Sequence, residues 1–237
     1  MRKMILTRSI AVLSLLSLLA TATAFGQTRR QPDLTNSEIA RGLREALLQG
    51  VRRSVSDLGR EDGFLDNDRV RIPLPNGLQR MEKTLRFMGQ GRRVDDFVVA
   101  MNRAAEAAVP AAIDVFLDSA SQMTFSDARN ILMSGQDDAA TQFFRRTSEE
   151  RLRKEFRPIV EEFTEKVGVT QQYKSLIGRY GVIGKAFGQD ASDLDGYVTQ
   201  KAMDGLFLLI ADEERRIRRD PIGRTTAILR RVFGILK

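Results

Sequence analysis

Residues 205–211 read GLFLLIA, and this stretch decides the fold. It lies inside a longer segment, 196–219, that we expect to form one long helix. No residue of GLFLLIA is charged or strongly polar, so a helix through it has no side that favours water. The run is also much shorter than the roughly 20 apolar residues of a membrane-spanning helix. We therefore expect this helix to lie at the centre of a helical core.

The segment that begins near residue 36 shows the periodicity of an amphipathic helix. Its apolar residues recur every three or four positions until Gly59 ends the pattern. They are Ile39, Leu43, Leu47, Val51, Val55 and Leu58. Similar patterns recur along the chain. They predict an all-α fold, a single multi-helix domain over residues 37–237 with kinked long helices.

Glycines and prolines predict where these helices break. Gly89 and Gly91 should end a helix that begins near Leu78, and a longer helix should follow them. Pro110 should kink or split that longer helix, because proline has no amide hydrogen to donate and its ring clashes with the preceding turn. Pro158 predicts a bend in a later helix for the same reason.

Two threonines carry the signature of a helix N-cap. Thr124 with Asp127 predicts the start of a short helix, and Thr147 with Glu150 predicts the start of a long one. In both pairs the hydroxyl and the carboxylate are spaced to satisfy each other's free backbone amides.

One segment does not read as a helix. In residues 64–74 apolar side chains alternate with Arg71 and Pro73, which is typical of extended chain. Pro73 and Pro75 cannot donate hydrogen bonds to a neighbouring strand. We therefore expect at most one short β-hairpin here.

The N-terminus has the pattern of a secretory signal peptide. Basic residues precede an apolar run over 10–20, and a small-residue motif, Ala22-Thr23-Ala24, follows it. We expect a signal peptide over residues 1–24, a disordered segment over 25–36, and a mature, exported, periplasmic protein. Because the chain has no cysteine, it is not expected to be a lipoprotein.

The composition excludes several chemistries. The chain has no cysteine and no histidine, which rules out disulfides, thiol catalysis, thiolate or imidazole metal sites and Ser-His triads. We expect no metal site and no cofactor. The loop QDASDLDG, 189–196, resembles a calcium loop, but an EF-hand alignment on Gly196 places Ala191 and Ala202 where ligands are required.

Positive charge gathers near the C-terminus. The chain has 38 basic and 31 acidic residues, a net charge of +7, and the segment 212–237 holds a basic excess. A basic helix can bind an anionic membrane or polyanion, or it can be a solvated face with Arg–Glu pairs. Nucleic acid is not expected as a partner of an exported protein. The surface-binding candidates are Arg215, Arg216, Arg218, Arg219, Arg230 and Arg231.

The stretch SGQDDAATQFFRR, 134–146, is the first candidate ligand site. Asp137, Asp138 and Arg145 lie on one half of a helix through it, and Phe143 and Phe144 lie on the other. The carboxylates can simply cap the helix, with the phenylalanines in the core. Alternatively, the polar half binds a ligand or a cation.

Two further clusters leave the same alternatives open. Asn102, Arg103 and Glu106 lie on an alanine-rich helix, where partly buried polar groups need partners. They can form a structural network or line a cavity. Tyr197 and Asp204 share one side of the 196–219 helix with Lys201, so Asp204 can pair with Lys201 or serve as a site carboxylate.

Several segments together resemble a known bacterial family. They are EDGFLDNDRVRIPLP (61–75), VDDFVVAMNRAAEAAVP (94–110), MTFSDARNIL (123–132), DDAATQFFRRT (137–147) and LDGYVTQKAMDGLFLLIADEERRIRRDP (194–221). In this order they resemble the family catalogued as domain of unknown function 4197, over about residues 37–234. The resemblance implies an exported, helical, single-domain protein and supplies no catalytic residues.

These observations favour a non-enzymatic exported module that binds a hydrophobic small ligand or a partner protein, because alanine-rich faces and proline bends can open a groove. One alternative is a peripheral membrane or polyanion binder that uses the arginine-rich C-terminal helices. Another is a glycan hydrolase of the cell wall that works with carboxylates only, with Glu106, Asp138 and Asp204 as candidates.

Overall fold

The computed structural model describes residues 35–168, 171 and 193–219. These residues belong to one compact unit, Leu34–Lys237. They are almost entirely helical, as the sequence predicts, and no strand occurs among them. The expected signal peptide and the candidates Arg230 and Arg231 lie outside the described residues.

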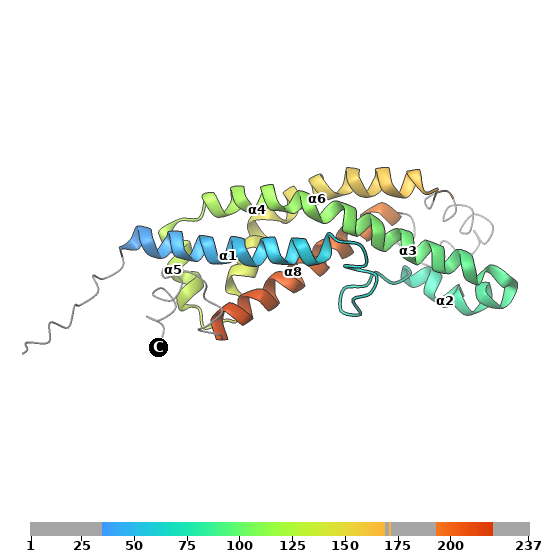
Figure 1. The fold of residues 1–237 in the computed structure, drawn as a ribbon, viewed down its shortest axis with the longest axis horizontal. Coiled ribbons are helices and arrows are strands. Elements are labelled where there is room, and N and C mark those ends of the chain that lie inside the picture. The colour runs from blue at the N-terminus through green and yellow to red at the C-terminus, as the bar shows by residue number, and fades with distance from the viewer. Residues whose placement is uncertain (1–34, 169–170, 172–192, 220–237) are drawn as a thin grey trace, which may run out of the picture. The chain divides into compact units, whose positions relative to one another are not determined.

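The helices are α1 (Asn36–Leu58), α2 (Asn76–Leu85), α3 (Gly91–Ala108), α4 (Ala112–Ser121), α5 (Phe125–Met133), α6 (Ala139–Lys166) and α8 (Leu194–Arg219). Those from α2 to α6 follow one another through short connections, whereas the longer non-helical segment 59–75 joins α1 to α2 (Figure 1). A π-helical turn, Arg86–Gln90, joins α2 to α3, and a 3-10 turn, Val109–Ala111, joins α3 to α4.

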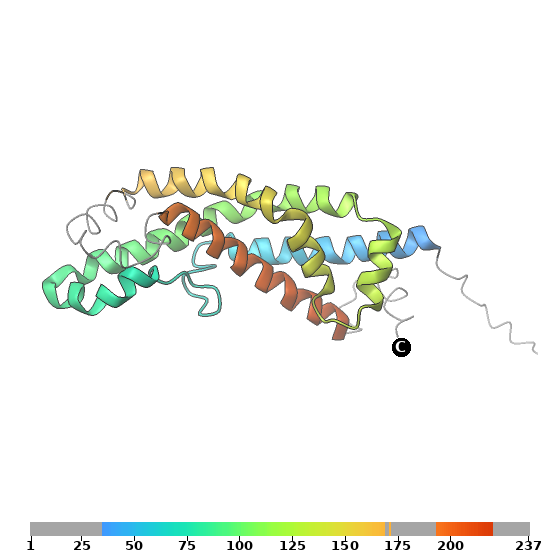
Figure 2. The ribbon, with the colours of Figure 1, turned by 180° about the vertical axis from the view of Figure 1, so that it is seen from behind.

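The helix that carries GLFLLIA is central, as predicted. It is α8, which packs against α1, α3 and α6 (Figure 2). Leu206, Phe207 and Ile210 are buried in its apolar part, and Phe207 packs edge-on against Phe116 of α4. Because this part of the helix is apolar all round, it needs neighbours on several sides.

The helix breaks predicted at Gly89 and Pro110 are confirmed. Pro110 lies in the 3-10 turn that separates α3 from α4. Gly89 has a φ of 75°, a left-handed conformation that glycine adopts at little cost, and it interrupts the helical path between α2 and α3. Pro158 lies inside α6, which continues on both sides of it.

One of the two predicted caps is confirmed and the other is wrong. Thr124 and Asp127 form a reciprocal capping box at the start of α5, and the hydrogen bonds from Thr124 lower the pKa of Asp127. Thr147 instead lies within α6, where its hydroxyl donates to the Phe143 carbonyl at 2.9 Å. The helix continues through Thr147 because Phe143 and Phe144 are buried in the core. Thr35, the first described residue, caps α1, so this helix begins just inside the segment expected to be disordered.

The short hairpin that the sequence allows at 64–74 does not form; the segment contains turns and extended chain. Side chains of α3 take the place of a partner strand. The Ile72 amide donates to Asn102 Oδ1 at 2.8 Å, and Asn102 Nδ2 donates back to the Ile72 carbonyl at 3.0 Å. The Phe64 amide donates to Glu106 Oε1 at 3.0 Å. Since buried backbone groups must be paired, these contacts hold the segment without a β-ladder.

Candidate functional site

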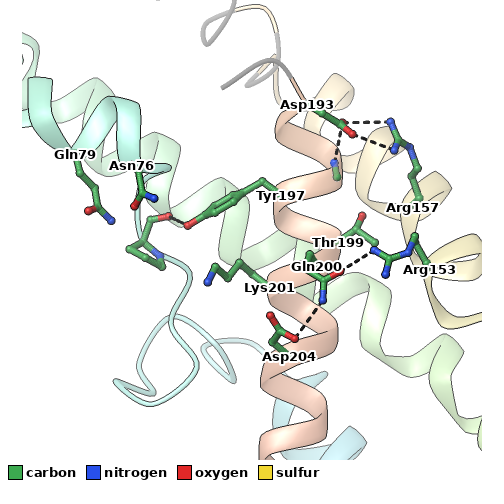
Figure 3. A pocket seen from close by; sticks show the side chains of 12 residues that line it. Asn76, Gln79, Arg153, Arg157, Asp193, Tyr197, Thr199, Gln200, Lys201 and Asp204 are labelled. Atoms are coloured by element: carbon green, nitrogen blue, oxygen red, sulfur yellow. Dashed lines mark hydrogen bonds and ion pairs between the residues drawn. The ribbon is translucent and has the colours of Figure 1, made fainter. Parts of the chain in front are cut away.

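A polar groove of about 680 Å³ runs along the outer face of α8. Figure 3 shows α8 as its floor, with α6 on one side and the start of α2 on the other. Residues of α8 at helical spacing line the floor. The lining is Pro73, Asn76, Gln79, Arg153, Arg157, Asp193, Gly196, Tyr197, Thr199, Gln200, Lys201 and Asp204.

Two arginines form the α6 side of the groove. Arg153 donates to Gln200 Oε1 at 2.7 Å, and Arg157 donates to both carboxylate oxygens of Asp193, at 3.1 and 3.2 Å. Hydrogen bonds from Arg157 to Glu161 and its contacts with Asp193 raise the pKa of Arg157 above its ordinary value. The guanidinium of Arg157 therefore stays charged, and all three of its nitrogens already donate to the carboxylates of Glu161 and Asp193.

Tyr197 and Lys201 extend from α8 toward the other side (Figure 3). The Tyr197 hydroxyl donates to the Pro73 carbonyl at 3.1 Å, which ties α8 to the segment before α2. The Lys201 ammonium lies 5.8 Å from the centre of the Tyr197 ring, a cation–π contact. Lys201 is exposed, and no carboxylate of the described residues forms an ion pair with it.

Asp204 closes one end of the floor. It accepts from Arg145 at 3.3 Å and from Gln200 at 3.2 Å, so its partners differ from the Lys201 pairing considered above. The Arg145 guanidinium also lies 4.4 Å from the centre of the Phe207 ring. Of the sequence-predicted site residues, Tyr197 and Asp204 line the groove, and Arg145 reaches it through Asp204.

The predicted cluster on α3 lies apart from this groove. Asn102 and Glu106 are buried and hold the backbone of the 64–72 segment. Arg103 bonds Glu106 at 2.7 Å and Asp62 at 2.6 Å, and the Glu106 contact is the main reason that its pKa is raised. These polar atoms therefore form a structural network.

Asp137 and Asp138 also lie elsewhere, at the start of α6. Asp137 pairs with Arg219 at 2.7 Å, and Asp138 accepts from the Gln142 side chain at 2.9 Å. Neither carboxylate caps α6 as the sequence suggests. A buried carboxylate of α8, Glu214, does so, through the amides of Ala140 and Thr141 at 2.9 and 2.8 Å.

The described C-terminal arginines are all paired with carboxylates. Their partners are Asp212 for Arg215, Glu213 for Arg216, Glu214 for Arg218 and Asp137 for Arg219. Arg218 is also largely buried and donates to the Ile131 carbonyl at 3.1 Å. This arrangement agrees with one of the two interpretations of the sequence, a solvated helix face on which arginines pair with carboxylates.

The sequence analysis missed Arg153 and Arg157 as site residues. Their signal was a charged stripe at a spacing of four, Arg145, Glu149, Arg153, Arg157 and Glu161. Such stripes usually mark a solvated helix face. Only the packing of α6 beside α8 turns this one into the wall of a groove.

A second hollow of about 720 Å³ lies beside the 60–69 segment. It is more open and is lined mainly by charged groups, among them Asp57, Asp66 and Arg69. Across residues 35–168 and 193–219, no cluster of three or more acidic side chains is placed to hold a metal ion. No helix in the described part is long and apolar enough to cross a membrane.

Comparison with known families adds one match. The family model described as "Protein of unknown function (DUF4197)" covers residues 33–234, which include every residue of the groove. The chain belongs to this family. No curated protein and no solved structure matches the chain. The family assignment thus agrees with the sequence resemblance, and the groove is described from this member's own residues.

Proposed function

We propose that the protein is a non-enzymatic, exported binding module whose α8 groove takes a small ligand with a carboxylate or phosphate group. The observation that carries this proposal is the placement of Lys201. Its ammonium faces the groove with a tyrosine ring beside it and no carboxylate partner among the described residues.

The balance of charge around the groove supports an anionic ligand. Arg153 and Arg157 flank the floor opposite Lys201 and already pair with Glu149 and with Glu161 and Asp193, so among the described residues Lys201 is the lining cation that is left for a ligand. Charge-assisted hydrogen bonds to arginine and lysine are the usual means of holding carboxylates and phosphates. The arginines are already oriented by Asp193 and Gln200, so little side-chain freedom is lost on binding.

The polarity of the lining favours such a ligand over the hydrophobic one expected from the sequence. Asn76 and Gln79 face the groove with amide groups, and the Asp193 carboxylate packs directly over Gly196 on its floor. The Thr199 hydroxyl of α8 is buried beneath the floor and has no hydrogen-bond partner among the described residues. Apolar ligands are usually held in apolar pockets, and this lining offers hydrogen-bonding groups instead.

Export is part of the proposal and rests on the N-terminal sequence. The basic start, the apolar run and the small-residue motif before Phe25 support cleavage of residues 1–24 and a periplasmic location without a lipid anchor. An intact mass that begins near Phe25 would support this, and a protein that keeps Met1 after export would contradict it.

The other two functions have less support. Arg215, Arg216 and Arg219 already pair with carboxylates, which lowers the charge that they offer to a membrane or polyanion. Glu106 is bonded to the 64–65 backbone and to Arg103, so its carboxylate is not free to act on a glycan.

The test begins with native mass spectrometry of the protein from its own cells, which reports any ligand that copurifies. Titration calorimetry with inorganic phosphate and with citrate then measures binding directly. Lys201→Met should weaken citrate binding about tenfold or more, because it removes the ammonium and keeps the apolar stem. Lys154→Met is the control, since Lys154 is exposed on α6 and does not line the groove.

Two results would overturn the proposal. One is a protein without copurifying ligand that binds neither phosphate nor citrate. The other is equal weakening of binding by the two lysine variants, which would indicate general attraction of anions to a basic protein.

A further inference from the structure

The turn between α2 and α3 exposes two neighbouring apolar side chains. Phe87 is 93% exposed and Met88 is 54% exposed. Leaving a phenylalanine in water forgoes one of the largest gains that a side chain can make by burial. Phe87 and Met88 lie in the π-helical turn at the end of the α2–α3 hairpin (Figure 1).

Exposed ion pairs link the two helices of the hairpin next to this turn. Arg86 donates to Glu82 of α2 at 2.9 Å and to both carboxylate oxygens of Asp95 of α3, at 2.6 and 3.3 Å. The Arg86 contact lowers the pKa of Asp95. Next to it, Leu85 and Val94 are buried and anchor the hairpin to the core. Phe87 is therefore presented by an ordered turn.

Exposed cations flank the two apolar side chains in the sequence. Residues 83–93 contain Lys83, Arg86, Arg92 and Arg93 and no acidic residue. Lys83, Arg92 and Arg93 are exposed, and none forms an ion pair with a carboxylate of the described residues. The nearest carboxylates along the chain, Glu82 and Asp95, bond Arg86. We name residues 83–93 the basic–aromatic tip.

We propose that the basic–aromatic tip binds the surface of an anionic phospholipid bilayer, with Phe87 and Met88 inserted among the headgroups. Cations near such a surface gain electrostatic attraction, and inserted apolar side chains leave water. This site is distinct from the α8 groove and from the arginines of the C-terminal segment, so its test is independent of theirs.

The chemistry of the tip favours a bilayer over a protein surface. A stable protein interface buries roughly 1,000 Å² or more, whereas the apolar part of the tip consists of two side chains. A second copy of the chain would bring two clusters of cations together, which is unfavourable. A bilayer needs no matching shape and supplies both the negative charge and the apolar interior.

The test uses a fluorescent probe at the tip. The chain contains no tryptophan, so Phe87→Trp in the protein purified after export creates a single indole that reports on this position alone. With vesicles of phosphatidylglycerol and phosphatidylcholine, we expect its emission to shift to shorter wavelength. Vesicles of phosphatidylcholine alone should leave it unchanged. Salt raised to about 0.5 M should reverse the shift, because it screens exposed charges.

Paired variants test the contribution of charge. In the Phe87→Trp background, Arg92→Gln with Arg93→Gln should raise the lipid concentration needed for half the shift about tenfold or more. Arg41→Gln with Arg52→Gln is the matched control, since both arginines are exposed on α1, away from the tip in the sequence. A second control, Met133→Trp in the otherwise unchanged chain, places the indole at another exposed apolar position.

Three outcomes would overturn the proposal. The Phe87→Trp variant could float with anionic vesicles while its emission stays that of an indole in water, which would place the membrane contact elsewhere. The Met133→Trp variant could show as large a shift as the Phe87→Trp variant, which would show no preference for the tip. The emission of the Phe87→Trp variant could shift with protein concentration in the absence of lipid, which would make the tip a contact between copies.

Discussion

At the scale of single residues, Glu214 shows how a side chain on one helix starts another. Its carboxylate accepts the amides of Ala140 and Thr141 and the Thr141 hydroxyl, all within 2.9 Å, and also binds Arg218. These are the free amides that a cap normally satisfies. Asp138, which directly precedes α6 in the chain, makes no such bond. The start of α6 therefore depends on the position of α8.

Replacing Glu214 with alanine should lower the free energy of unfolding by about 3 kcal/mol. Glu214 is buried and Arg218 is largely buried, so the change removes the carboxylate partner of a largely buried cation and the acceptor of two interior amides. Urea denaturation followed by circular dichroism would measure the loss.

The control for this change is Glu150→Ala on the surface of α6. Glu150 is exposed and its ion pair with Arg153 is long, 3.8 Å, so the expected loss is below about 1 kcal/mol. If Glu214→Ala cost no more than Glu150→Ala, the carboxylate would not be the cap on which α6 depends.

At the scale of elements, α8 passes unusually close to the non-helical 64–70 segment. The contact is at Gly205, where a Cβ would lie 2.8 Å from Phe64 Cε1 and 3.2 Å from Val70 Cβ. Both neighbours are buried. Glu106 fixes this segment to α3 at Phe64, and Asn102 fixes the chain just after it at Ile72, so it cannot easily move away from α8.

Gly205→Ala should therefore destabilise the protein by about 1 to 3 kcal/mol. Alanine favours a helix over glycine by about 1 kcal/mol, but the overlap with the fixed Phe64 ring outweighs that gain. The shift in the midpoint of thermal unfolding would measure the balance.

Gly50→Ala on α1 provides the matched comparison. A Cβ there would meet Glu213 Cβ at 3.4 Å, close to ordinary contact, so the change should be neutral or stabilising. Stabilisation by both substitutions would mean that the 64–70 segment yields, and would contradict the close packing inferred for it.

At the scale of the whole molecule, features local in sequence predicted the fold. The apolar period of α1, the apolar GLFLLIA, the break at Pro110 and the cap at Thr124 each depend on neighbouring residues. The cap predicted at Thr147 is wrong because the same residue pattern also occurs in the middle of a helix. The burial of the preceding phenylalanines favours a helix that continues through Thr147.

Only half of the groove could be predicted from the sequence, because the other half depends on how two helices pack together. Tyr197 and Asp204 share a face of one helix, which periodicity reveals. Arg153 and Arg157 belong to another helix, and no periodic pattern tells which faces of two helices will meet. Likewise, the sequence predicts that Asn102 needs a hydrogen-bond partner, but only the fold shows that this partner is the backbone of Ile72.

The composition of the whole chain also predicts its response to pH. With no histidine and no cysteine, the chain has no side chain whose ordinary pKa falls between about 5 and 8. Its thermal midpoint should therefore change little over that range. Below this range, the stability of the fold depends on the carboxyls of Asp95 and Asp127, because Arg86 and Thr124 lower their pKa values in the folded state. Such groups stabilise the fold above their unfolded pKa, about 3.9, and that contribution is lost as the pH falls through the folded value.

Thermal scans followed by circular dichroism from about pH 8 to about pH 2.5 would test this expectation, with a fall in the midpoint beginning near pH 4. Asp127→Asn should lower the midpoint at neutral pH and reduce the fall in acid, since asparagine cannot lose a charge there. A step in the midpoint between about pH 6 and about pH 7 would contradict the prediction, because it would require a side chain that titrates far from its ordinary range.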